Sequence, residues 1–288
     1  MSTPVAQIPF IRPTLWRSLL ASWTLTGKLG LAVLAFFVLV ALVAPFLPMN
    51  LGEMSDAGVF QGMSVKHWLG TDYLGRDMLV RIVAGTPYTI GVAFAATLLA
   101  CGFGAVLGLL SAVSGGWLDG ALSRGMDTLI SIPSKLLALV IIAGFGSSVT
   151  LLVATAAVVY TPGCFRIIRS VSVNINAMDY IVVAKARGER NGYIMRREIL
   201  PNIWGPLLAD MGLRFVYSMR LLASLSFLGL GVQPPMADWG SLVRENLGTL
   251  PVGGVSVVAP AIAIALLTIA ANLVIDNLPS ARESGESH

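Results

Sequence analysis

Charged residues are scarce in this sequence. Asp, Glu, Lys and Arg make up only 12% of its 288 residues, whereas hydrophobic residues make up 56%. Soluble domains carry roughly 25% charged residues and build their cores with less apolar surface. The mean hydropathy of +0.80 agrees with this excess. The composition therefore argues against a soluble domain.

Histidine and cysteine are also rare. The two histidines, His67 and His288, form no H-E-x-x-H motif, which argues against an intramembrane zinc protease. Cys101 and Cys164 are too few for a disulfide framework. Both lie within apolar runs, where we expect small buried side chains. We predict neither a metal site nor catalytic residues in this chain, which is not expected to be an enzyme.

A phosphate-binding loop is missing as well. The nearest approach to G-x-x-x-x-G-K-[ST] is "TGKLG" at 26–30, which lacks the upstream glycine and the following hydroxyl. The chain therefore cannot cradle nucleotide phosphates by that route.

Long uncharged runs are what the sequence has in abundance. Residues 86–118 and 136–165 carry no charge over 33 and 30 positions. A helical crossing of a bilayer needs about 20 apolar residues, and continuous runs favour helices over a barrel. We predict an all-α membrane protein in which Pro133 kinks the third span. The six expected transmembrane helices lie near 29–48, 87–113, 118–146, 149–168, 204–230 and 254–276.

The cations are distributed unevenly between the spans. Residues 166–200 carry seven cations and three acids, whereas 231–253 carry one cation and two acids. Because Lys and Arg collect on the cytoplasmic side, both termini are expected there. Residues 1–28, with three cations and no acid, read as a cytoplasmic segment before an uncleaved signal anchor. The cations of these cytoplasmic segments then account for the pI of about 9.3, and no nucleic-acid partner is needed to explain it.

This reading divides the chain into three parts. They are the N-terminal segment 1–28, a transmembrane domain 29–278 that contains a charged loop at 169–203, and a polar cytoplasmic tail 279–288.

The charged loop contains the segment "DYIVVAKARGERNGYIMRREILPN", residues 179–202. Helical spacing groups Tyr180, Ile181, Val183 and Ala184 on one face, and Gly188 is expected to end this helix in a left-handed conformation. A second helix follows and stops at the L-P pair 200–201. Such an amphipathic pair can lie on lipid headgroups or insert into a groove of a partner, and the residues alone leave both readings open.

This segment resembles the EAA loop of the membrane subunits of ABC importers. The family pattern is E-A-A, three residues, glycine, a nine-residue spacer and I-x-L-P. Here valines replace the glutamate and the first alanine, and Glu198 stands at the isoleucine position. The matching positions are Val182, Val183, Ala184, Gly188, Glu198, Leu200 and Pro201. The resemblance implies a coupling contact with a separate ATPase through Ala184, Lys185, Arg187, Gly188, Glu189, Arg190, Leu200 and Pro201.

Two further blocks are similar to the C-type permeases of dipeptide, oligopeptide and nickel importers. They are "HWLGTDYLGRDMLVRIVAGTPYTI" at 67–90 and "LSFLGLGVQPPMADWGSLVREN" at 225–246, and the segment from Gly115 to Leu137 also fits. The likeness extends from about residue 30 to about residue 279. It implies the type I ABC importer permease fold in a bacterial cytoplasmic membrane, with cargo such as di- or oligopeptides. The implied partners are a second, B-type permease, two subunits that bind ATP and Mg, and an extracytoplasmic solute-binding protein.

Other functions remain open at this point. The same architecture serves importers of nickel chelates, opines or other small solutes. A carrier driven by an ion gradient, or a channel, is a different class, against which stand the coupling-type loop and the lack of a detectable inverted repeat.

The fifth expected span carries three ionisable residues, which are costly in lipid and usually face a bundle interior or an aqueous path. Asp210 and Arg214 are four residues apart and are expected to share a helix face and pair. Arg220 is a candidate for the translocation path together with these two. Its alternative role is a structural tie to Asp127 or Asp276.

The loop 231–253 is a candidate docking surface for the binding protein through Asp238, Trp239 and Arg244. Asp238 is expected to cap a short helix that begins at Trp239, with the indole at the membrane interface. We interpret the polar group His67, Asp72, Arg76 and Asp77 as a turn and helix start outside the membrane. Gly104 and Gly108 form a GxxxG pattern that predicts close helix packing.

Overall fold

The computed structural model describes residues 23–47, 58–252 and 254–277, which fold into helices joined by short loops. The described part of the chain contains no strand beyond an isolated bridge between Thr71 and Asp77. Most of the predicted N-terminal segment 1–28 and the tail 279–288 lie outside the described residues, and those two expectations stay untested.

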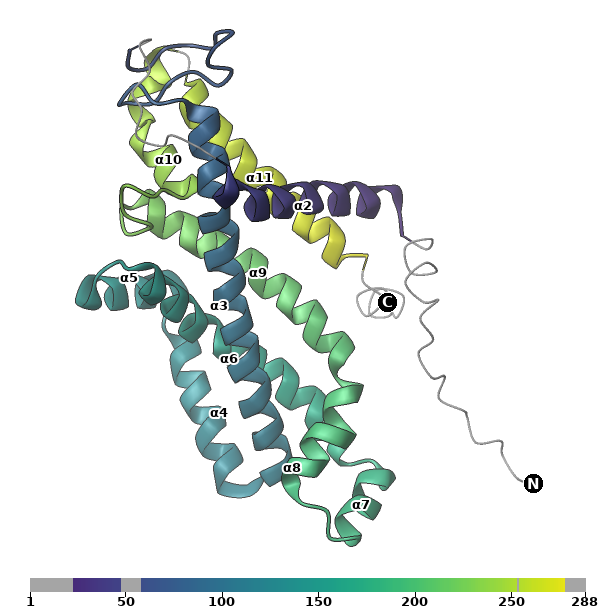
Figure 1. The fold of residues 1–288 in the computed structure, drawn as a ribbon. Helices are drawn as coiled ribbons and strands as arrows, with labels where there is room; N and C mark the ends of the chain where they lie inside the picture. Colours follow the sequence, from purple (N-terminus) through teal and green to yellow (C-terminus); the bar gives the residue numbers. More distant parts are fainter. Residues whose placement is uncertain (1–22, 48–57, 253, 278–288) are drawn as a thin grey trace.

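Two long helices form the centre of the fold. Helix α3 (Met78–Ser114) runs the length of the molecule, and α6 (Val149–Asn176) packs along it in the most extensive helix contact of the structure (Figure 1). The GxxxG glycines make this approach possible, as predicted. A Cβ on Gly104 would lie 2.7 Å from the Cβ of Cys164, and one on Gly108 would lie 3.0 Å from the carbonyl oxygen of Phe165.

Three more long helices surround this pair. Helix α9 packs on α3 and α6, while α2 and α11 contact each other and cross beside α3 (Figure 1). Apolar side chains dominate α2 and α11, as a lipid environment requires. Their bounds are α2 Leu25–Val43, continued by the short turn η1 Ala44–Phe46, α9 Trp204–Phe227, and α11 Val255–Ile275.

The predicted third span is broken rather than kinked. Helix α4 (Gly116–Ser131) and helix α5 (Ser134–Phe145) meet at an angle of 88°. Ile132 between them is extended, with φ −86° and ψ 127°, because the ring of Pro133 disfavours helical geometry in the preceding residue. The single continuous helix expected over 118–146 is therefore wrong, since this proline redirects the chain instead of bending it.

By length and apolar composition, four helices in the described residues can cross a membrane: α2 with η1, α3, α6 and α11. The broken pair α4–α5 raises the number to five. Helix α9 is long enough, but Asp210, Arg214 and Arg220 make it more charged than the others. The molecule is thus a multi-pass helical membrane protein, with four or five spans supported by composition.

Two groups of elements mark the ends of the bundle. At one end, the segment 58–77 lies beside α10 (Trp239–Glu245) and the turn η4 (Leu247–Val252). At the other end are α7 (Asp179–Ala186) and α8 (Asn191–Tyr193). We call these the α10 end and the α7 end. They lie at opposite ends of α3 (Figure 1).

Candidate coupling and translocation sites

The charged loop at the α7 end folds as two helical pieces around a glycine turn, as the sequence predicts. Gly188 has a φ of +83°, the left-handed conformation that glycine adopts without strain. The amide of Glu189 donates to the carbonyl of Ala184 at 3.2 Å, and that of Gly188 donates to the carbonyl of Lys185 at 2.9 Å. This pair of bonds is a Schellman motif, which satisfies the last carbonyls of α7.

The second piece is irregular. After α8 the backbone continues as a π-helical turn, η2 (Ile194–Ile199), and a 3₁₀ turn, η3 (Leu200–Asn202), before α9 begins. Pro201 lacks an amide hydrogen and lies at this junction. The helix expected to stop at the L-P pair instead changes type there, and helical turns continue to Asn202.

One face of the loop is anchored on the bundle. Ile181, Ala184, Ile194 and Ile199 are fully buried, and the three isoleucines pack in a cluster with apolar residues of α3 and α6. The contact prediction for Ala184 is therefore corrected. Its small side chain lets α7 lie close to the bundle, so it is not available to a second protein.

The opposite face is open. Val182 and Val183 are each 56% exposed, and Tyr180 is also exposed, so the predicted grouping of Tyr180 and Val183 with the buried residues is wrong. Because residues three apart lie on the same face of a helix, Ile181 and Ala184 both face the bundle and their neighbours face away from it. Although Tyr180 is exposed on one side, partial desolvation of its phenol raises the pKa of this group, and the nearby Glu198 carboxylate adds to this effect.

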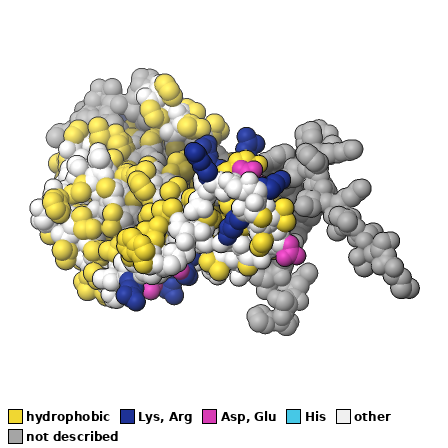
Figure 2. Space-filling view, turned by 90° about the horizontal axis from the view of Figure 1, so that it is seen from below, with side chains coloured by type: hydrophobic (Ala, Val, Ile, Leu, Met, Phe, Trp, Pro, Cys, Tyr) yellow, Lys and Arg dark blue, Asp and Glu magenta, His cyan; other side chains and the backbone are white. Residues whose placement is uncertain are grey.

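Cations surround this apolar surface. Figure 2 shows the molecule from the α7 end, where Lys and Arg side chains project around exposed hydrophobic ones. Glu189 and Leu200 are half-buried, and Pro201 is exposed. The exposed basic residues of the loop are Lys185, Arg187, Arg190, Arg196 and Arg197. The loop thus offers a partner an apolar strip with a positive border.

The ionisable residues of α9 differ in their surroundings. Asp210 and Arg214 pair as predicted, with Nε–Oδ2 at 3.2 Å and Nη2–Oδ1 at 3.0 Å. Arg220 is exposed, and within the described residues it has no hydrogen bond or ion pair. The alternative tie between Arg220 and Asp127 is not formed, because Asp127 lies 4.0 Å from Arg166 instead.

Cys101, Cys164 and Asp210 form a buried group, whose potential ligand atoms all lie within 4.8 Å of one another. The Cys164 thiol donates to the Cys101 carbonyl at 3.7 Å, and Asp210 is engaged by Arg214. The two thiols occupy the tight contact between α3 and α6, in keeping with the expected small buried side chains.

At the α10 end, Asp238 caps α10 as predicted. Its Oδ1 accepts from the amides of Gly240 and Ser241, and its Oδ2 accepts from the Ser226 hydroxyl at 2.7 Å and the Val232 amide at 3.1 Å. Burial raises the pKa of the Asp238 carboxyl, and these donors oppose that rise. Trp239 is also fully buried, against Phe37, and its indole donates to the Ile82 carbonyl.

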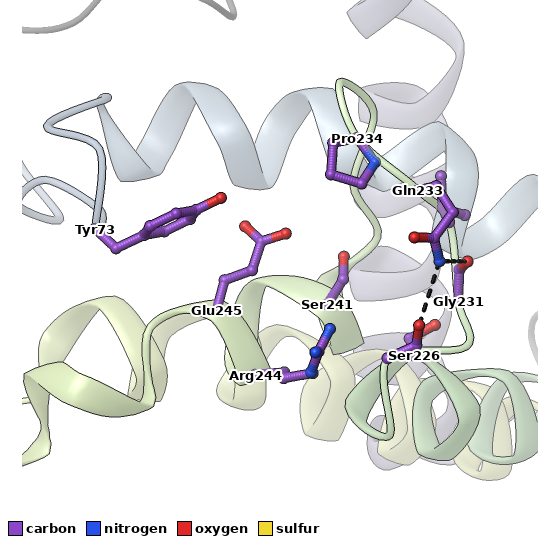
Figure 3. A pocket seen from close by; sticks show the side chains of 10 residues that line it. Tyr73, Ser226, Gly231, Gln233, Pro234, Ser241, Arg244 and Glu245 are labelled. Atoms are coloured by element: carbon purple, nitrogen blue, oxygen red, sulfur yellow. Dashed lines mark hydrogen bonds between the residues drawn. The ribbon is translucent and has the colours of Figure 1, made fainter.

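This burial corrects two predictions. Asp238 and Trp239 are buried and hold α10 in place, so neither side chain is exposed to a docking protein or to the membrane interface. Arg244 is exposed and lines a pocket of about 360 Å³ with Tyr73, Gln233 and Glu245 (Figure 3). Only Arg244 remains a candidate docking residue.

The polar group near the start of α3 is a turn, as interpreted. Asp77 caps α3 through the Val80 amide, and His67 Nδ1 lies 2.7 Å from Asp77 Oδ2. Arg81 bridges Asp72 at 2.8 Å and Glu245 at 2.7 Å, which ties the turn to α10.

Sequence reasoning missed a cavity at the break between α4 and α5. It has a volume of about 510 Å³ and is lined by Arg166, Arg214 and Tyr160, among others. Pro133 was the available signal, because a helix broken inside a membrane protein is a common place for a binding site.

The fold and the loop at the α7 end define a helical membrane permease of the ABC-importer type. Residues 104–282 match the family described as "Binding-protein-dependent transport system inner membrane component". The chain belongs to this family.

Curated relatives extend the likeness over most of the chain. The dipeptide transport system permease protein DppC of Alkalihalophilus pseudofirmus is 35% identical over 253 residues, covering 88% of this chain and 83% of that protein. The glutathione transport system permease protein GsiD of Pectobacterium atrosepticum is 32% identical, covering 96% and 95%. DppC of Haemophilus influenzae is 32% identical, covering 88% of each.

A solved structure shares the fold. A chain of the inward-facing MetNI methionine ABC transporter aligns with a TM-score of 0.53 and 18% identity, covering 70% of this chain and 97% of that one. At this identity the likeness concerns the fold alone.

Proposed function

We propose that this chain is the C-type, non-catalytic membrane subunit of an ATP-driven importer of di- or oligopeptides. The observation that carries the proposal is the loop at the α7 end, where a Schellman turn ends α7, the buried Ile181 anchors this helix on α3 and α6, and an apolar strip stays exposed. A partner that pushes on this strip acts directly on the central helix pair. Family membership supports the same role.

In the proposed topology the α7 end faces the cytoplasm and the α10 end faces outward. The chain crosses the membrane six times, with α4–α5 and α9 as the third and fifth spans, and both termini are cytoplasmic. The basic residues of the loop support this orientation. The transmembrane domain then occupies 29–278, with the coupling loop at 169–203.

The proposed assembly contains a second, B-type permease, two ATP-binding subunits that hold ATP and Mg, and a solute-binding protein. Lys185, Arg187, Gly188, Glu189, Arg190, Leu200 and Pro201 form the coupling contact, together with the exposed Val182 and Val183. The solute-binding protein docks at the α10 end, where Arg244 is exposed. Arg220, Arg214 and Asp210 belong to the translocation path, because an exposed arginine within a span requires water or a partner chain.

The printed names of the relatives supply the cargo class. They are permeases of a dipeptide and of a glutathione transport system. A nickel chelate, an opine or another small solute remains the second candidate within the same architecture.

Uptake by the complete transporter in proteoliposomes tests this function. We expect uptake of a labelled dipeptide to require ATP on the side of the α7 end and the loaded binding protein on the other side, and to persist when ion gradients are collapsed. Uptake that stops with the ion gradient and continues without ATP would identify a secondary carrier instead. ATP-driven uptake of another solute, with none of the dipeptide, would keep the transporter class and reject the cargo.

A further inference from the structure

A cavity that opens at the surface lies at the break between α4 and α5. Helix α5 leaves α4 at 88°, and residues of α4, α5, α6 and α9 line the space at this corner. The resulting volume is about 510 Å³, enough for a small ligand, and its lining combines aliphatic side chains with polar ones. The polar groups are Ser134 on α5, Tyr160 and Arg166 on α6, and Arg214 and Tyr217 on α9.

The polar lining is partly fixed in place. Arg214 is held by two contacts to Asp210, and its guanidinium lies directly against Gly163, where a Cβ would collide with it. The Tyr160 hydroxyl donates to the Tyr217 carbonyl at 3.0 Å. Both Arg214 and Arg220 lie close enough to this phenol to interact with it electrostatically.

Arg166 gives the cavity an available positive charge. Its side chain is 62% exposed, and its nearest acid, Asp127, is 4.0 Å away and 63% exposed. Such a loose, hydrated pair leaves the guanidinium free to bind a stronger partner. Asp210 already neutralises Arg214, so Arg166 and Arg220 supply the net positive potential here.

The two arginines that line the cavity lie away from the helix ends at the α7 end. Arg166 is ten residues before the end of α6, and Arg214 is ten residues after the start of α9. At 1.5 Å per residue, both arginines are about 15 Å along their helices from the α7 end. Arginines in membrane helices usually face an aqueous path or a ligand site.

We propose that this cavity binds a carboxylate of the cargo during its passage. Arg166 binds the carboxylate, and Arg214, Tyr160 and Tyr217 form the fixed polar lining around it. The inference rests on the proposed function and names the chemical group that the membrane subunit recognises. Peptides with free C-termini carry this group, and arginine binds it through two parallel hydrogen bonds.

The reaction rates of a single cysteine placed in the cavity lining report the electrostatic potential of the cavity. The native Cys101 and Cys164 are buried, so the unmodified chain gives the background. In the assembled transporter, we would place Ser134→Cys in the lining and compare its reaction rates with an anionic and a cationic methanethiosulfonate of similar size. Val140→Cys is the matched control, because Val140 lies on the same helix, is 71% exposed and does not line the cavity.

We expect the anionic reagent to react faster at Ser134→Cys, and Arg166→Gln to reduce this preference by about tenfold while Arg166→Lys retains it. Val140→Cys should show no such preference. Millimolar alanyl-alanine should protect Ser134→Cys, and alanyl-alanine amide, which lacks the carboxylate, should not.

Equal rates for both reagents, or equal protection by the peptide and its amide, would overturn the proposal. Protection that requires phosphatidylglycerol in the vesicles and ignores the peptide would also overturn it and assign the cavity to lipid. Failure of ATP-driven dipeptide uptake, with the anionic preference and peptide protection intact, would count against the proposed function and leave the carboxylate site standing.

Discussion

Arg169 on α6 and Asp119 on α4 form a two-pronged ion pair, with Nε–Oδ1 at 2.5 Å and Nη2–Oδ2 at 2.6 Å. Ser111 at the end of α3 donates to the same carboxylate. Three helices are thereby joined near the α7 end. Helix α4 has no buried residue of its own, so this polar contact fixes it beside α6.

Asp119→Asn should therefore loosen α4. The two side chains are about a third exposed, so we expect the free energy of unfolding to fall by about 1 kcal/mol, which is less than the loss of a buried pair would cost. The apparent unfolding temperature in detergent should fall, and proteolysis within α4 should accelerate. Arg124→Gln, on the same helix and without an ion pair in the described residues, should change neither. Equal effects of both variants would contradict the account.

Gly104→Leu should separate α3 from α6. Even the Cβ would lie 2.7 Å from that of Cys164, so the helices must move apart, at a cost of about 1–3 kcal/mol. Gly102→Leu makes the same change two residues earlier, where a Cβ meets nothing within 4 Å. We expect a lower apparent unfolding temperature and yield for Gly104→Leu alone. An unchanged Gly104→Leu protein would refute the tight contact.

Gly188→Ala tests the turn of the coupling loop. A Cβ there meets no neighbour, so the expected cost of about 1 kcal/mol comes from the φ of +83° alone. Because this strain disturbs the Schellman motif, ATPase stimulation by the loaded binding protein should fall several-fold. Gly192→Ala, in equally open space in the same loop, should leave stimulation unchanged. Retained stimulation in Gly188→Ala would mean that the turn does not set the coupling geometry.

Asp238→Asn should weaken the α10 end. Asparagine keeps only one of the two acceptor oxygens, so its –NH2 group faces either the Ser226–Val232 pair of donors or the Gly240–Ser241 pair, and at least one buried donor loses its partner, which costs about 1–3 kcal/mol. The apparent unfolding temperature should fall, and the segment 228–238 should become sensitive to protease. Arg244→Gln, at an exposed side chain, should keep wild-type stability. Stability unchanged by Asp238→Asn would show that these bonds contribute little.

Local signals in the sequence predict much of this molecule. Gly188 and the L-P pair indicate the turn and the change of helix type in the loop, because backbone restrictions act on neighbouring residues. Asp238 indicates a helix start, and the spacing of Asp210 and Arg214 indicates their pairing. Each of these features depends on a few residues along one segment.

Features that depend on distant segments were beyond sequence reasoning. The start of α3 after Asp77 agrees with the sequence, but the ion pair of Arg81 with Glu245, which lies 164 residues away, depends on how α10 packs against α3. Trp239 is buried because α10 folds back onto α2 and α3, which an amphipathic indole does not reveal. Pro133 indicates a break, but only the packing of α5 determines its 88° angle.

The central claim is that the open face of α7 is the contact with an ATPase. A photoreactive amino acid, p-benzoylphenylalanine, at Val183 in the assembled transporter tests it most directly, because this side chain is 56% exposed next to buried anchors. The same probe at Val258, exposed on α11, is the control. We predict a cross-link to the ATP-binding subunit from position 183 and none from position 258. An active transporter without a cross-link at position 183, or with equal cross-links from both positions, would contradict the account.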